Sequence, residues 1–383
     1  MCDILKHTTM KTGDKTMKKI HRTLSLFTVA AMCTALLCSC GAVPDSSQTD
    51  SSSKAATTTT ADTTADTTTT GEASSTASAT SAPDSSVSDS SSAVTDDTKT
   101  NGITPAMWKV TSPEGNTMVM LGSFHALKDE CYPLPEAVTN AYNNADILAV
   151  ECDITSTSED GEYMKNLMKQ MLYNDNTKLS QHISEEAYSA LQTYLGYWGM
   201  DISALEVYRP WAVSSTLDTL LIQDSGFDTE KGLDNYLLTT AHADGKEIYE
   251  VESVDFQMNL LINFSDDIYD LMFRSYEGET KESQKQALED LYTAWKSGDI
   301  ETFLEEDNEE ELAGYTEEDK KIAEDYNNQM LYDRNKNMAK AAEDLMSQGK
   351  NVFYVVGAAH YAGEGGIIDL LEKDGYTAER VQY

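Results

Sequence analysis

The pattern of apolar and polar positions marks a short buried strand near the end of the chain. Residues Val352–Val356 are all β-branched or aromatic, and the run stops at Gly357. A histidine, His360, follows three residues later, and an apolar helix-like run begins at Ile367. A strand, a glycine-containing turn with a polar residue and a helix, in that order, are typical of the carboxyl edge of an α/β sheet, where ligands bind.

The same pattern occurs a second time, far upstream. In Met118–Leu127 an apolar run reaches Gly122, and His125 again follows three residues later. A lone histidine after a strand is usually structural. Two of the six histidines of this chain share one local pattern, however. We therefore predict that His125 and His360 are functional.

Further apolar runs predict the rest of the fold. The expected strands are Met107–Thr111, Asn116–Leu121, Asp146–Asp153, Lys246–Val251 and Tyr376–Gln382. Helical periodicity covers Pro135–Asn144, residues 161–244 with breaks near Gly199 and at Arg209-Pro210-Trp211, and residues 254–348. Strands at both ends with helices between them predict an α/β (α+β) fold with a helical middle region, including an acidic helical region at about 264–345.

The beginning of the chain has the composition of a leader. Met17-Lys18-Lys19 opens a basic segment, Leu24–Leu37 is apolar, and Leu37-Cys38-Ser39-Cys40 matches a bacterial lipobox. We expect residues 1–39 to be a lipoprotein signal peptide, with Met17 a better start than Met1, and Cys40 to carry the lipid. The alternative is an ordinary cleaved secretory signal, and the apolar run is too short to span a membrane comfortably.

Residues 40–100 are almost wholly Ser, Thr, Ala and Asp. Such a segment lacks the apolar side chains needed to offset the entropy lost on ordering, so we expect a disordered tether. The folded part is then residues 101–383, held by lipid to a cell membrane on its extracytoplasmic face. No sequence pattern indicates an oligomeric state.

Charge and cysteine content narrow the choice of partners. The chain has 28 Lys and Arg against 65 Asp and Glu, a formal net charge of −37, which makes nucleic acid an unfavourable partner. Cys131 and Cys152 are the cysteines of the folded part. A disulfide between them and two free thiols are both compatible with an extracytoplasmic protein.

Glu151 ends the expected strand Asp146–Asp153. A carboxylate at that place costs free energy unless it is paired or coordinated, and the alternative is a solvent-facing or ion-paired Glu. We expect His125, His360 and Glu151 to meet at one sheet edge. Two imidazoles and a carboxylate form a common set for a divalent metal, zinc included, with Glu151 either a ligand or the general base. No His-Glu-x-x-His sequence is present, which excludes a thermolysin-like protease.

Two arginines are further candidates. Arg209 lies in Tyr-Arg-Pro-Trp and Arg334 in Tyr-Asp-Arg-Asn. Each is either stacked or ion-paired for structural reasons, or it is a fixed cation that stabilises a substrate carboxylate or a developing oxyanion.

These separate pieces together resemble the TraB/PrgY/GumN family, which includes the Tiki proteases. The resemblance covers most of residues 104–383 and rests on Leu121-Gly-Ser-Phe-His125, Ala145-Asp-Ile-Leu-Ala-Val-Glu151, Arg209-Pro-Trp, Gly232-Leu-Asp234, Val251-Glu252 with Gln257, Arg334-Asn335 and Val356-Gly-Ala-Ala-His360. It implies a fold like that of erythromycin-esterase-like and ChaN-like proteins, with two pseudo-symmetric sheet-bearing halves. It also implies a protease dependent on manganese or cobalt.

The resemblance assigns site residues as well. It implies that His125, Glu151 and His360 belong to the metal site and that Arg334 and Asn335 form an adjacent polar motif, with Arg209 a weaker candidate. The leading hypothesis is a lipid-anchored metal-dependent peptidase that cleaves peptides or proteins. The alternatives are a non-catalytic tethered protein that sequesters a peptide, haem or metal, and an esterase that acts on a small ester.

Overall fold

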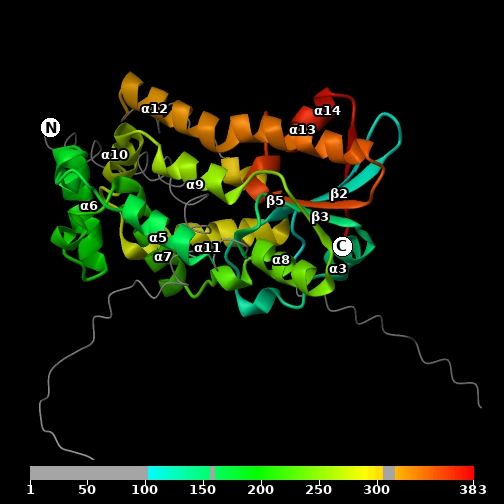
Figure 1. Cartoon of the computed structure of the whole chain (residues 1–383), viewed down its shortest axis with the longest axis horizontal. Coiled ribbons are helices and arrows are strands. Elements are labelled where there is room, and N and C mark those ends of the chain that lie inside the picture. Colours follow the sequence, from blue (N-terminus) through cyan, green and yellow to red (C-terminus); the bar gives the residue numbers. More distant parts are fainter. Residues whose placement is uncertain (1–101, 156–159, 305–314) are drawn as a thin grey trace, which may run out of the picture. The chain divides into compact units, whose positions relative to one another are not determined.

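The computed structural model describes residues 102–155, 160–304 and 315–383. The expected signal peptide, Cys40 and the tether lie outside these residues. In the described ranges, no helix has the length and apolar character required to cross a membrane. The described part has the expected mixed α/β fold, in which helices pack against both faces of one sheet (Figure 1).

The sheet has six strands in the order β4-β3-β5-β2-β1-β6. Strands β4, β3, β5 and β2 run parallel to one another, whereas β1 and β6 are antiparallel to their neighbours. Every expected strand is present, with ends that differ by a few residues. The strands are β1 (Met107–Thr111), β2 (Thr117–Ser123), β3 (Ile147–Val150), β4 (Glu247–Glu250), β5 (Val352–Gly357) and β6 (Thr377–Arg380).

The two strand–Gly-x-x-His units lie side by side in this sheet. Strand β2 pairs directly with β5, with Gly122 opposite Val356 and Ser123 opposite Gly357. The two sheet-bearing halves implied by the resemblance are therefore joined in one continuous sheet. Both histidines leave the sheet at the same edge.

The helices occupy the expected middle region and the segments that connect the strands. The breaks near Gly199 and before Pro210 are real, and Pro210 stands at the first position of its helix, where its missing N–H costs nothing. The helices are α3 (Glu136–Asn144), α5 (Gly161–Gln170), α6 (Glu185–Tyr197), α7 (Pro210–Asp224), α8 (Leu233–Asp244), α9 (Val254–Ile262), α10 (Asp266–Arg274), α11 (Lys281–Ser297), α12 (Glu317–Asn327), α13 (Asp333–Ser347) and α14 (Ile367–Lys373).

Buried side chains gather in two cores. One core surrounds the sheet, where all six residues of β5 are buried, and includes α13 and α14 on one side and α3 and α8 on the other (Figure 1). The second core lies among helices α5, α6, α7, α9 and α10. A five-residue π-helical segment, Asn328–Tyr332, links α12 to α13 and contributes Leu331 to the first core and Met330 to the second.

Candidate functional site at the carboxyl edge of the sheet

A polar residue follows each of the four parallel strands. His125 comes after β2, Glu151 directly after β3, Glu252 after β4 and His360 after β5. Because the carboxyl ends of parallel strands share one sheet edge, the topology alone brings these four side chains together. The convergence of His125, Glu151 and His360 is therefore as the sequence predicted.

Glu151 is 9% exposed, and its carboxylate accepts hydrogen bonds from three donors. Its Oε1 accepts from the Gly357 backbone N–H at 2.7 Å. Its Oε2 accepts from Gln257 Nε2 at 2.9 Å and from Arg334 Nη2 at 2.8 Å. Burial alone would raise the pKa of Glu151, but Arg334, the two histidines and the Gly357 N–H hold this pKa well below its usual range.

Arg334 comes from the first turn of α13 and is 3% exposed. Its Nε and Nη2 donate to the two oxygens of Glu252 at 2.9 and 2.8 Å, in the bidentate geometry that suits a guanidinium. Its Nη1 donates to the Met330 carbonyl at 3.1 Å. The guanidinium therefore joins the ends of β3 and β4 through Glu151 and Glu252.

His360 is fixed by a neighbour of that arginine. Asn335 Nδ2 donates to the Gly365 carbonyl at 2.9 Å, so Asn335 Oδ1 faces His360 Nδ1, 2.6 Å away. This arrangement places the proton on Nδ1 and leaves the Nε2 lone pair 3.8 Å from Glu151 Oε1. Burial and the nearby Arg334 lower the pKa of His360 to about 3, so the ring is neutral at pH 7.

His125 is fixed by a carboxylate. Its Nδ1 lies 2.7 Å from Asp234 Oδ2, which comes from the first turn of α8. Burial would lower the pKa of His125, but Asp234 overcomes this effect and raises it to about 9. The backbone fits closely here as well, because a Cβ at Gly232 would lie 2.1 Å from the His125 carbonyl oxygen. The Gly232-Leu-Asp234 sequence thus supports His125 through both backbone and side chain.

The three predicted metal-site residues face one small space beside Gly357. A Cβ at Gly357 would lie 3.1 Å from Glu151 Oε1, 3.4 Å from His125 Nε2 and 3.5 Å from His360 Cδ2. The Nδ1 atoms of both histidines are engaged on the far side by Asp234 and Asn335. Metal-binding histidines are held in this way in proteins, so the donor chemistry fits a divalent cation.

The described residues nevertheless contain no group of three or more His, Cys, Asp or Glu side chains that is already arranged to hold a metal ion. Both oxygens of Glu151 accept protein hydrogen bonds, and Asp234 favours the protonated form of His125. Binding of a cation by His125 Nε2 would therefore require the loss of the His125 proton, whereas Glu151 Oε1 accepts one hydrogen bond and keeps a lone pair for a cation.

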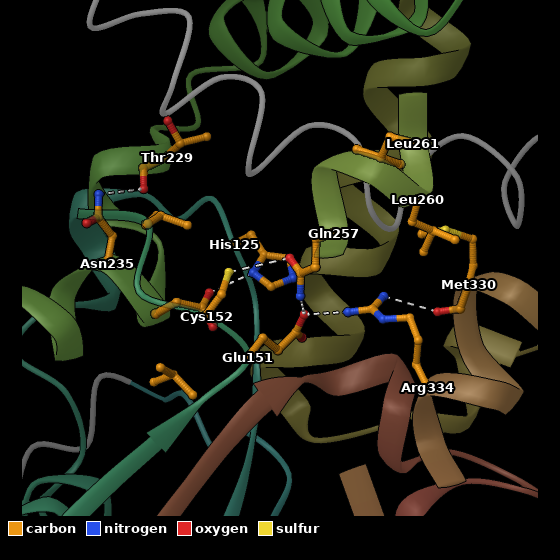
Figure 2. A pocket seen from close by; sticks show the side chains of 13 residues that line it. His125, Glu151, Cys152, Thr229, Asn235, Gln257, Leu260, Leu261, Met330 and Arg334 are labelled. Atoms are coloured by element: carbon orange, nitrogen blue, oxygen red, sulfur yellow. Dashed lines mark hydrogen bonds and ion pairs between the residues drawn. The ribbon is translucent and has the colours of Figure 1, made fainter. Parts of the chain in front are cut away.

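His125, Glu151, Asp234 and Arg334 line a cleft, whereas His360 and Asn335 are not among the described residues that line it. Figure 2 shows His125, Glu151, Gln257 and Arg334 at its centre, with Glu151 joined by hydrogen bonds to Gln257 and to Arg334. Residues from the loop after β3, from α8, from α9 and from the π-helical segment complete the lining. The cleft thus lies between the sheet core and the helical core.

Other predicted residues lie elsewhere or have simpler surroundings. Arg209 precedes α7 and its guanidinium lies 5.9 Å from the centre of the Tyr173 ring, and it is not among the described residues that line the cleft. Cys131 and Cys152 are separate free thiols. Cys131 lies 3.0 Å from the Tyr292 hydroxyl, whereas Cys152 lines the cleft.

Three site residues were not assigned roles from the sequence. Asp234 binds His125, Gln257 binds Glu151, and Glu252 binds Arg334. All three stand in segments that the resemblance includes. Their positions on α8, on α9 and after β4 gave no chemical signal, because one polar residue on a helix is usually exposed to solvent.

The TraB/PrgY/gumN family model matches residues 106–380, and the chain belongs to this family. The chain is 24% identical over 293 residues to the Metalloprotease TIKI homolog of Nematostella vectensis, a match that covers 65% of this chain and 61% of that protein. It is 26% identical over 161 residues to Metalloprotease TIKI1 of Xenopus tropicalis, covering 38% of this chain and 32% of that protein.

A bacterial relative is similar over a shorter region. The chain is 26% identical over 157 residues to the protein YbaP of Escherichia coli (strain K12), a match that covers 41% of this chain and 56% of that protein. The chain thus spans less than two thirds of the length of these curated relatives. No solved structure matches the chain.

Proposed function

We propose that the chain is a peptidase that uses a divalent metal held by His125, His360 and Glu151 to hydrolyse peptides or proteins. One observation carries the proposal. The three side chains converge beside Gly357, while each histidine Nδ1 is engaged on the opposite side. The metalloprotease names of two relatives support the reaction class.

A divalent cation bound there would supply Lewis-acid activation of water and of the substrate carbonyl. The family resemblance favours manganese or cobalt, and two imidazoles with one carboxylate also suit zinc. In this proposal Asp234 and Asn335 fix the ring orientations of His125 and His360, so that the Nε2 atom of His125 lies toward Gly357 and that of His360 toward Glu151.

Glu151 acts in this proposal as a ligand rather than a general base. Its pKa is held low by Arg334, so the carboxylate stays ionised and accepts protons poorly near pH 7. Arg334 donates to two carboxylates and to the Met330 carbonyl. We therefore propose that Arg334 positions Glu151. Stabilisation of the oxyanion is then the role of other hydrogen-bond donors that reach into the cleft.

The proposed setting is the extracytoplasmic face of a cell membrane, with the lipid on Cys40 as anchor. The support for this setting is the lipobox sequence and the Ser- and Thr-rich composition of residues 42–100. Palmitate labelling of the wild-type full chain and of its Cys40→Ser variant tests the anchor. We expect the label on the wild type and not on the variant.

The test of the reaction uses purified protein and a peptide mixture, with new amino termini counted by mass spectrometry. We expect bound metal in the wild type, cleavage that a chelator stops, and neither property in the His360→Ala variant. The matched control is His182→Ala, because His182 binds Asp266 and stacks on Tyr173 away from the cleft. Equal cleavage by the His360→Ala variant would contradict the mechanism.

One observation favours a second function, a tethered protein that binds a peptide, haem or metal without turnover. The Glu151–Arg334 ion pair balances the charge of this carboxylate without a catalytic cation. Capture of peptides by the wild type with no new amino termini would support this second function over the first.

A further inference from the structure

One wall of the cleft is made of aliphatic side chains. Leu260, Leu261 and Met330 line the cleft beside the polar cluster. They come from two separate segments, namely helix α9 and the π-helical segment. Figure 2 shows Leu260, Leu261 and Met330 together on one side of Gln257, and Thr229 and Asn235 on the opposite side of His125.

This wall is partly open to water. Leu260 is half-buried, whereas Leu261 and Met330 are 2% and 3% exposed and form the inner part of the wall. Half-buried aliphatic groups in a concave site gain free energy when an apolar ligand covers them. The wall therefore favours an apolar group as its occupant.

The charges of the cleft do not offer a partner to a charged group. His125 is paired with Asp234 at 2.7 Å and Glu151 with Arg334 at 2.8 Å, and among the described residues these four are the charged ones that line the cleft. A charged substrate side chain would thus lose its water shell with no opposite charge left to bind it. Thr229 and Asn235, on the other wall, present polar groups of the kind that bind a peptide backbone.

We propose that this aliphatic wall is a subsite for a large, uncharged apolar side chain of the substrate, such as Leu, Phe or Met. The position of that side chain would be next to the peptide bond that faces His125, Glu151 and His360. The inference rests on the proposed function, because only a peptidase would cleave the bound peptide. Binding of an apolar side chain to the subsite can nevertheless be measured without turnover.

Leu260 decides the size of the subsite. Because Leu260 is half-buried on α9, its replacement by Trp can extend into the cleft without a cavity being left in the core. Asn259, the preceding residue on the same helix, is exposed and does not line the cleft. Asn259→Trp is therefore the matched control for Leu260→Trp.

The test uses the full chain, immobilised, and a random-sequence octapeptide mixture. Retention is measured with a chelator present, and cleavage is measured separately with added Mn²⁺. For the wild type we expect Leu, Phe or Met to be enriched about 10-fold or more over Ala, Glu and Lys at one position, the range that hydrophobic pockets reach. Leu260→Trp should shift the enrichment to Ala and Gly, and Asn259→Trp should keep the wild-type profile.

The outcomes separate the two proposals. Enrichment of apolar residues in retained peptides without any cleavage supports the subsite and contradicts the peptidase. Cleavage with no apolar preference at any position supports the peptidase and overturns the subsite. An unchanged profile in Leu260→Trp, with the substitution confirmed to leave the protein folded by circular dichroism, also overturns the subsite.

Discussion

Arg334 Nη2 donates to Glu151 Oε2 at 2.8 Å, across 183 residues of sequence. The same guanidinium binds both oxygens of Glu252. One buried cation thus holds the first turn of α13 against the carboxyl ends of β3 and β4. The position of the candidate ligand Glu151 depends on this contact, so the stability of the fold and the geometry of the site are coupled here.

The first prediction concerns that cation. Replacing Arg334 by Gln leaves two buried carboxylates without an opposite charge, and we expect a loss of about 3–5 kcal/mol in the free energy of unfolding. Urea unfolding followed by circular dichroism measures it. Lys336→Gln is the control on the same helix, because Lys336 is exposed and, among the described residues, pairs only with Asp333. This variant should change stability by less than about 0.5 kcal/mol. Equal effects in the two variants would contradict the role of Arg334.

The second prediction concerns the support of His125. Asp234→Asn removes the carboxylate that raises the pKa of His125, so this pKa is expected to fall from about 9 in the metal-free protein. Histidine NMR signals followed against pH measure the change. Metal affinity or peptidase activity should fall about 10–100-fold, since the ring loses its fixed orientation. Asp228 is not among the described residues that line the cleft, so Asp228→Asn should change neither the His125 pKa nor the metal affinity. An unchanged His125 pKa in Asp234→Asn would contradict the role assigned to Asp234.

The sequence was sufficient to predict the sheet edge. An apolar run marked β2 and a β-branched and aromatic run marked β5, each followed by a glycine, so the positions of His125 and His360 followed from local patterns. Parallel pairing then brought Glu151 between them. These features depend on residues that are close together in the sequence, which is why periodicity found them.

The contacts that fix the site residues in place could not be predicted from the sequence. Asp234, Gln257 and Glu252 each reach a partner that is at least 82 residues away in the chain. Their pairing depends on how α8, α9 and α13 pack against the sheet edge, and helix packing angles are not encoded in a local pattern. The separate thiols Cys131 and Cys152 illustrate the same limit, because both a bridge and free thiols matched the sequence.

The third prediction concerns a buried acid outside the site. Asp218 on α7 is 4% exposed, its Oδ2 has no hydrogen-bond partner among the described residues, and burial raises the pKa of Asp218 well above its usual value. The folded protein therefore holds this proton more tightly than the unfolded chain. The resulting stabilisation is present below the unfolded pKa of about 3.9 and is lost as pH rises through the folded pKa.

Asp218→Asn removes this dependence. Relative to the wild type, the variant should gain stability as the pH of urea unfolding experiments is raised from about 4 to about 7. Asp224→Asn on the same helix is the opposing control. Hydrogen bonds from Lys281 and Lys285 lower the pKa of Asp224, so its contribution is present above the unfolded pKa and its loss should destabilise the protein as pH rises. Parallel trends in the two variants would refute the account of Asp218.

The fourth prediction tests the point at which the three candidate ligands meet. Gly357 has φ −51° and ψ 138°, which any residue adopts, so Gly357→Ala brings no backbone strain. The new methyl group would lie 3.1 Å from Glu151 Oε1 and 3.4 Å from His125 Nε2, in the space that a cation would take. We expect stability within about 1 kcal/mol of the wild type, with peptidase activity reduced about 100-fold or more because the reacting groups are displaced.

Two measurements on Gly357→Ala separate a blocked site from a damaged fold. Metal content should fall together with activity, while the urea midpoint stays near that of the wild type. Gly196→Ala on α6 is the control, because a Cβ there meets no atom within 4 Å, and it should retain full metal content and activity. If Gly357→Ala kept both as well, the space beside Gly357 would not be where the reaction occurs, and the proposed metal site would have to lie elsewhere along the cleft.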